Sequence, residues 1–151
     1  MMLTKAGEYA VRCMLFLAGE RERDVVLKKD VSEAMKIPGS FLAKIAQNLA
    51  KAGLIQIVQG PRGGYRMLKS AEEVTLLEVI EAVEGEIFLN ECLFRPDSCH
   101  RSLFCGVHQV WEKAREGLRE TLSVPLSDLL CMENSRRSLD GGEDSGSQSD
   151  S

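Results

Sequence analysis

The sequence predicts a mainly α-helical protein that carries one small β-hairpin. Three observations predict this fold class. Apolar residues recur at helical spacing through the N-terminal third, two β-prone runs flank a Gly/Pro turn near residue 60, and a long amphipathic stretch lies near residue 110. Only 5% of the 151 residues are aromatic, so aliphatic packing between helices should dominate the core. In this order, the elements predict a winged helix-turn-helix followed by a long C-terminal helix suited to dimerisation.

Three helices are expected before the hairpin. The first covers residues 5–18, with Thr4 able to cap it and Gly19 able to end it. The second covers residues 28–35, and a Pro-Gly break then separates it from a third over residues 40–52. Ser40 is expected to cap this third helix, and Gly53 to end it in a left-handed conformation. Its expected inward positions are Phe41, Leu42, Ile45, Leu49 and, at the end, Leu54.

The hairpin is expected from strands at residues 54–58 and 65–68, joined by a turn rich in glycine. In a winged helix-turn-helix the helix after the tight turn enters the major groove of DNA, and the hairpin reaches the flanking backbone or minor groove. Arg62 supplies a positive charge at the hairpin tip, where Gly63 and Gly64 allow close approach to phosphates. An ordinary turn would also use glycine, but here the glycines coincide with an arginine and with the basic N-terminal half of the chain.

Charge is unevenly distributed along the chain. Residues 1–69 hold twelve Lys or Arg and six Asp or Glu, a balance of 12 − 6 = +6. Residues 70–151 hold seven and seventeen, a balance of 7 − 17 = −10. The basic N-terminal part is compatible with nucleic-acid binding, although the net charge of the chain is −4.

The C-terminal half is expected to begin with a helix over residues 75–84 and to continue with a long helix over residues 103–122. An apolar stripe along the long helix consists of Val107, Val110, Trp111, Ala114, Leu118 and Leu122. A domain this small cannot bury such a stripe alone, so it should pack on a second copy in a homodimer. We therefore expect a DNA-binding domain at 1–69, a dimerisation region at 70–132 and a disordered acidic tail at 133–151.

Three cysteines and a histidine, Cys92, Cys99, Cys105 and His108, lie in a segment expected to be an irregular loop that leads into the long helix. Thiolates and imidazole are ligands for iron–sulfur clusters and for zinc, and buried structural cysteines are the third interpretation. Six and five residues separate the cysteines, which is longer than the pairs typical of structural zinc. Of the remaining two cysteines, Cys13 lies within an apolar run and Cys131 directly follows one. Both are expected in the core.

The sequence resembles the Rrf-two family of bacterial winged-helix regulators over nearly the whole expected ordered chain. The segments that carry the resemblance are LTKAGEYAV at residues 3–11, IPGSFL at 37–42, GLI at 53–55 and GPRGGY at 60–65, followed by the three loop cysteines. One difference concerns the helix that reads DNA. Where IscR-like members have a glutamate and a glutamine, this chain has Ala43 and Lys44, and alanine cannot accept a hydrogen bond from cytosine.

In cluster-binding members of the family, the three loop cysteines hold an iron–sulfur cluster, which the resemblance assigns here to Cys92, Cys99 and Cys105. For the fourth ligand it offers His108, as in IscR-like members, or Glu8 of the partner subunit, as in NsrR-like ones. His108 is the preferred ligand, and a 2Fe–2S cluster is favoured, with 4Fe–4S as the alternative. For DNA contacts, the expected residues are Ser40, Lys44, Gln47, Arg62, Gly63 and Gly64.

The function expected from residues and resemblance together is a cytoplasmic, homodimeric transcription regulator, most simply a repressor, whose affinity for operator DNA depends on the cluster. The signal would be iron or cluster supply, nitric oxide or redox state. A zinc-bound or metal-free regulator of the same fold is the first alternative, and a cluster carrier or redox protein is the second. Neither a catalytic pair nor a nucleotide motif is evident, so an enzyme is not expected. A membrane partner is not expected either, because no apolar run is long enough.

Overall fold

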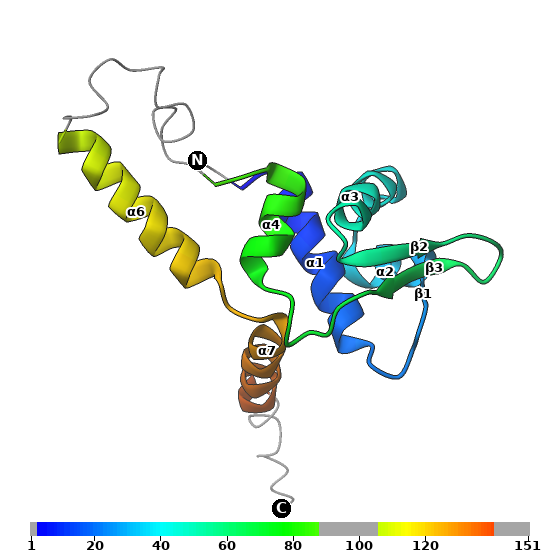
Figure 1. Cartoon of the computed structure of the whole chain (residues 1–151). Coiled ribbons are helices and arrows are strands. Elements are labelled where there is room, and N and C mark those ends of the chain that lie inside the picture. The colour runs from blue at the N-terminus through cyan, green and yellow to red at the C-terminus, as the bar shows by residue number, and fades with distance from the viewer. Residues whose placement is uncertain (1–2, 88–105, 141–151) are drawn as a thin grey trace, which may run out of the picture.

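The computed structural model describes residues 3–87 and 106–140 and confirms the mainly helical winged-helix fold class (Figure 1). A three-stranded antiparallel sheet is the β component of these residues. The elements in chain order are α1 Lys5–Gly19, β1 Val26–Leu27, α2 Lys28–Met35, α3 Gly39–Lys51, β2 Ile55–Val58, β3 Gly64–Met67, α4 Leu76–Glu84, α6 Gly106–Leu122 and α7 Leu126–Asp140.

Helix α1 lies in the middle of the molecule and contacts α2, α3, α4 and α7 (Figure 1). Its buried side chains include Ala10, Cys13, Met14 and Leu17, which recur every three or four residues along one side of the helix. Thr4 caps the helix as expected, its hydroxyl accepting a hydrogen bond from the Gly7 amide at 3.4 Å. The sequence prediction for this helix is therefore confirmed to within one residue.

The turn between α2 and α3 is fixed by local hydrogen bonds. The Ser32 hydroxyl donates to the Ile37 carbonyl at 2.6 Å, and the Ile37 amide donates back to the Ser32 carbonyl at 3.0 Å. The expected cap on α3 is wrong: Pro38 occupies the N-cap position without a side-chain bond, and Ser40 is an exposed residue inside the first turn. Proline suits this position because its fixed φ leads the chain into the helix. It also has no backbone N–H that would need a hydrogen-bond acceptor.

The end of α3 follows the prediction closely. Gly53 has a φ of 76°, and its amide donates to the Ala50 carbonyl at 3.0 Å while the Leu54 amide donates to the Leu49 carbonyl at 3.1 Å. These two bonds form a Schellman motif, which needs a left-handed residue at the glycine position. Leu54 is buried beyond the turn, so the motif directs the chain from α3 straight into β2.

The sheet has the strand order β1-β3-β2, and β1 was not predicted. Tyr65 in the central strand pairs with Val26 on one side and with Ile57 on the other. Its side chain is 1% exposed and belongs to the main core. Strand β1 has only two residues, which is too short to produce a detectable alternation of apolar and polar residues.

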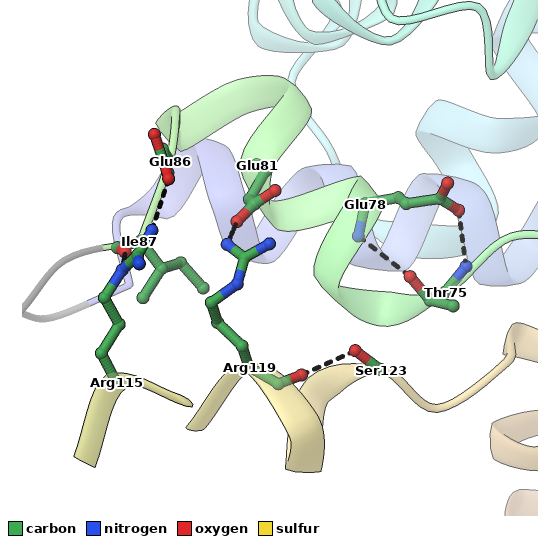
Figure 2. Close-up of polar contacts among 8 residues, drawn as sticks. All are labelled: Thr75, Glu78, Glu81, Glu86, Ile87, Arg115, Arg119 and Ser123. Atoms are coloured by element: carbon green, nitrogen blue, oxygen red, sulfur yellow. Dashed lines mark hydrogen bonds and ion pairs between the residues drawn. The ribbon is translucent and has the colours of Figure 1, made fainter. Parts of the chain in front are cut away.

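Helix α6 is attached to α4 through its C-terminal half (Figure 2). Arg115 donates to the Ile87 carbonyl at 2.6 Å and pairs with Glu86, while Arg119 pairs with Glu81. Leu118 and Leu122 pack against the small apolar cluster formed by Leu77, Ile80 and Ile87. A capping box between Thr75 and Glu78 begins α4, which fixes the helix that α6 rests on (Figure 2).

Helix α7 extends further than the sequence indicated. The expected ordered chain ended at residue 132, but α7 continues to Asp140, so residues 133–140 are helical rather than part of a disordered tail. Leu126 is fully buried where α7 begins, whereas residues 131–140 are all exposed and therefore have no apolar periodicity to detect. Residues 141–151 lie outside the described residues. Among the described helices, none has both the length and the apolar character needed to cross a membrane.

The packing of Gly64 against β1 gives a first prediction. A Cβ at this position would lie 2.0 Å from the Val26 carbonyl oxygen and 3.0 Å from the Leu27 Cα, both of them backbone atoms. Gly64→Ala should therefore lower the free energy of unfolding by about 1–3 kcal/mol, as expected for overpacking. Urea denaturation followed by circular dichroism measures this change.

Gly117→Ala is the matched control, because nothing lies within 4 Å of a Cβ built there, within α6. It should leave stability unchanged or raise it by about 0.5–1 kcal/mol, since alanine favours a helix interior over glycine. Equal stability losses in the two variants would contradict the packing role assigned to Gly64.

Candidate nucleic-acid interface and metal ligands

Helix α3 has one buried face and one exposed face. Leu42, Ile45 and Leu49 are each at most 2% exposed and attach the helix to the core. The predicted DNA-contacting residues Ser40, Lys44 and Gln47 are spaced four and three residues apart, and all three are exposed. That spacing puts them on a single face of the helix, opposite the core. The structure therefore brings these three predicted residues together on one surface.

Phe41 does not lie where the sequence predicted. It was expected in the core, but it is 46% exposed, at the third position of α3. Its ring packs edge-on against the ring of Tyr9 from α1, with centroids 5.6 Å apart and an interplanar angle of 69°. The guanidinium of Arg12 lies over the same Tyr9 ring, 5.5 Å from its centroid. The error has a simple cause: Leu42, Ile45 and Leu49 fill the buried face, and Phe41 lies at its margin.

The hairpin glycines have structural roles that the sequence did not distinguish. Gly60 has a φ of 102°, which favours glycine, and a Cβ on Gly63 would lie 2.2 Å from the Val58 carbonyl oxygen. Gly63 donates a backbone hydrogen bond to the Gly60 carbonyl at 2.9 Å, which closes the turn. Gly64 is required by its contact with β1. The turn is therefore held tight by backbone conformation and by a backbone hydrogen bond. The exposed Arg62 lies near its tip.

The basic residues of this region differ in whether they are already paired. Arg66, on β3, donates to Asp24 at 2.7 and 3.0 Å and to Gln56 at 2.9 Å. Within the described parts of the chain, neither Lys44 nor Arg62 makes an ion pair. Exposed cations without an acidic partner are the residues that can displace counterions from a phosphate backbone.

The candidate metal ligands are only partly within the described structure. Cys92, Cys99 and Cys105 lie outside the described residues, and residues 3–87 and 106–140 contain no group of three side chains able to hold a metal ion. His108 is partly buried in the first turn of α6, directly after the last cysteine. His108 also takes part in a further interaction, so it is not a free residue. The four-ligand constellation therefore stays a prediction.

Glu8 lies in the first turn of α1 and has an unusual carboxylate. Its Oε2 atom is excluded from solvent but accepts no hydrogen bond among the described residues, although Lys5 Nζ lies 3.1 Å away. The start of α1 also meets the end of α4, where the Thr4 amide donates to Glu84 at 3.3 Å. Glu8 is thus near the point where the chain enters the cysteine segment. The Lys5 ammonium is therefore the partner of this carboxylate, and the Glu8 side chain as a whole is 42% exposed.

The two remaining cysteines differ from each other. Cys13 is fully buried as predicted, and burial raises the pKa of its thiol to about 12, so it stays protonated and unreactive at neutral pH. Burial, with a smaller contribution from Cys13, also raises the pKa of Tyr65 to about 12. Cys131 was expected in the core, but this is wrong: it is exposed on α7, because only Leu126, Leu129 and Leu130 of that helix contact the core.

Comparisons with known proteins place this arrangement in context. The family model Rrf2, described as an iron-dependent transcriptional regulator, matches residues 3–131. A putative HTH-type transcriptional regulator of Haemophilus influenzae is 32% identical over 138 residues, covering 91% of each chain. The HTH-type transcriptional regulator IscR of Vibrio atlanticus is 34% identical over 131 residues, covering 86% of this chain and 75% of the relative.

Solved structures show the same fold. IscR of T. potens superposes with a TM-score of 0.68 at 24% identity, covering 98% of this chain and 93% of that one. The oxidised form of CymR from Staphylococcus aureus superposes with a TM-score of 0.66 at 26% identity, covering 86% and 96%. These likenesses agree with the winged-helix architecture described above.

Proposed function

This chain belongs to the Rrf2 family of transcriptional regulators, and we propose that it represses transcription as a homodimer whose affinity for operator DNA is controlled by an iron–sulfur cluster. The observation that carries the DNA-binding part is the exposed face of α3 beside a tight basic turn. Ser40, Lys44 and Gln47 lie on that face, and Arg62 extends from the turn. In this fold the helix enters the major groove, and the hairpin contacts the flanking backbone or minor groove.

Homodimerisation is supported by the apolar residues that α6 leaves exposed. Val107, Val110 and Trp111 are 56, 64 and 37% exposed, and no residue of α6 is fully buried. The C-terminal half of the helix is already attached to α4, so the exposed N-terminal half is the part available to a second copy. A twofold dimer would cover the same surface on both subunits and would pair two recognition helices for two half-sites.

The side chains of this chain fit an iron–sulfur cluster in donor chemistry. Cys92, Cys99 and Cys105 would supply three thiolates, and His108 would be the fourth ligand, because it follows Cys105 by three residues at the start of α6. Glu8 is the competing fourth ligand, because it lies in the first turn of α1, and the start of that helix meets the end of α4. The cluster would supply sensitivity to iron supply, redox state or nitric oxide, while the protein supplies the DNA contacts.

The position of α1 explains how such a site could act on DNA binding. Glu8 and Tyr9 are neighbours on α1, and the Tyr9 ring touches Phe41 on the recognition helix. A displacement of the first turn of α1 would therefore also displace α3. A ligand alters DNA affinity only by binding two conformations unequally, so the cluster must favour one placement of α3 over another.

The alternative is a zinc-bound or metal-free regulator of the same fold. The same fold occurs in CymR of B. subtilis, which is described as a global cysteine regulator, so the fold by itself does not require an iron–sulfur cluster. The visible absorption spectrum and iron and sulfide content of anaerobically isolated protein separate the two functions. A coloured protein with iron and sulfide supports the cluster, whereas a colourless protein with stoichiometric zinc, or with no metal after reconstitution, supports the alternative.

Arg62→Ala tests the role of the hairpin. Binding to all DNA sequences should weaken, and the slope of log affinity against log salt should fall by about one, as for one lost phosphate contact. Arg136→Ala, which removes an exposed arginine from α7, is the matched control and should leave the slope unchanged. A loss of preference at one base pair, with the slope intact, would instead make Arg62 a base reader.

The fourth ligand is tested by comparing the visible and Mössbauer spectra of anaerobically isolated variants. Cys99→Ala should abolish the cluster while circular dichroism remains that of the folded protein. His108→Ala should shift the spectrum or make the cluster labile, whereas Glu8→Ala should leave it unchanged. The opposite result for His108 and Glu8 would assign the fourth ligand to Glu8, and an unchanged spectrum in Cys99→Ala would refute the cysteine site.

A further inference from the structure

We propose that Phe41 reads the methyl group of a thymine in each half of the operator. This inference rests on the proposed DNA-binding function and adds a base preference to it. The observation behind it is the exposure of Phe41, which presents an apolar ring on the surface that carries Ser40 and Lys44.

The position of Phe41 along α3 favours contact with a base. It is the third residue of the helix, and the N-terminal residues of a recognition helix are the ones that contact base edges. Phe41 precedes Lys44 by three residues, so the two side chains are neighbours on the helix surface. Lys44 can bind a guanine or a phosphate, which leaves the flank towards α1 to Phe41.

The contact with Tyr9 restricts the Phe41 ring before DNA is bound. Tyr9 packs against the main core and holds the Phe41 ring by an edge-on contact at 5.6 Å between centroids. Arg12, on the same side of α1, places its positive charge over the Tyr9 ring. A ring that is already held in place loses little conformational freedom on binding, so more of the contact energy contributes to affinity.

The chemistry of the major groove selects thymine as the partner. A phenylalanine ring neither donates nor accepts a conventional hydrogen bond, and the only apolar group displayed in the major groove is the thymine C5 methyl. Ala43, two residues later, is also exposed and apolar, and it is the competing reader of the same group. Neither residue can accept a hydrogen bond from cytosine, so base selection at this position depends on the methyl group.

The experiment replaces thymines by deoxyuridine, which removes the methyl group and leaves base pairing intact. A duplex is first selected from a random library by the wild-type protein, and each of its thymines is then replaced in turn. Replacing one particular thymine of a half-site by deoxyuridine should weaken wild-type binding by about fourfold, which is the effect expected when one buried methyl group is lost. Affinity is measured by fluorescence anisotropy at fixed salt.

The variants assign the effect to a residue. Phe41→Ala should bind the thymine duplex more weakly and should show no further loss on the deoxyuridine duplex. Phe41→Leu, which keeps an apolar side chain, should retain part of the sensitivity. Leu139→Ala removes an exposed apolar residue from α7 and should respond to deoxyuridine as the wild type does.

Three results would overturn the proposal. The wild type could lose no affinity at any deoxyuridine position, Phe41→Ala could remain as sensitive as the wild type, or the sensitivity could disappear in Ala43→Gly and persist in Phe41→Ala. Each of these leaves DNA binding itself intact. Failure of the proposed function would be different, because no duplex would then be enriched from the library.

Discussion

The burial of α1 is the constraint on which the rest of this molecule depends. Ala10, Cys13 and Met14 are completely excluded from solvent, and the helix contacts α2, α3, α4 and α7. Each of those helices is therefore positioned by reference to α1 rather than by direct contact with all the others. Close packing allows little independent movement at such a position, so α1 shifts together with its neighbours or not at all.

This arrangement links the two proposed sites without requiring a long pathway. The first turn of α1 carries Glu8 and lies beside the end of α4, while the next residue, Tyr9, supports Phe41 on the recognition helix. Arg119 and the apolar contacts of its C-terminal half fix α6 to α4, and Arg115 fixes it to the residues that directly follow α4. A disturbance between α4 and α6 would thus be transmitted to α1 and from there to α3.

The sequence predicted the elements that have strong local signals. Thr4 and Gly53 mark helix ends by capping chemistry, and both act as expected. It failed where the outcome depends on tertiary packing. Strand β1 can pair with β3 because Gly64 has no Cβ that would collide with the backbone of β1. Phe41 is exposed because three aliphatic residues already fill the buried face of α3. A single sequence does not specify either contact.

The same distinction applies to the candidate site. Helical spacing was sufficient to place Ser40, Lys44 and Gln47 on one face, since that follows from helix geometry alone. The contact between Tyr9 and Phe41, in contrast, joins residues from two helices and could not be inferred from spacing. Cys131 and the extension of α7 were misjudged for a related reason: an exposed helix has no apolar pattern, and an apolar run does not show which of its members reach the core.

The central claim is that a cluster held by this chain controls its affinity for DNA. The most direct measurement compares the dissociation constant for one selected operator duplex before and after the cluster is removed anaerobically by a chelator, with the protein shown to remain folded. The account predicts that the two constants differ by about tenfold or more, corresponding to a coupling free energy of at least about 1.4 kcal/mol. Equal constants for the two forms would contradict it.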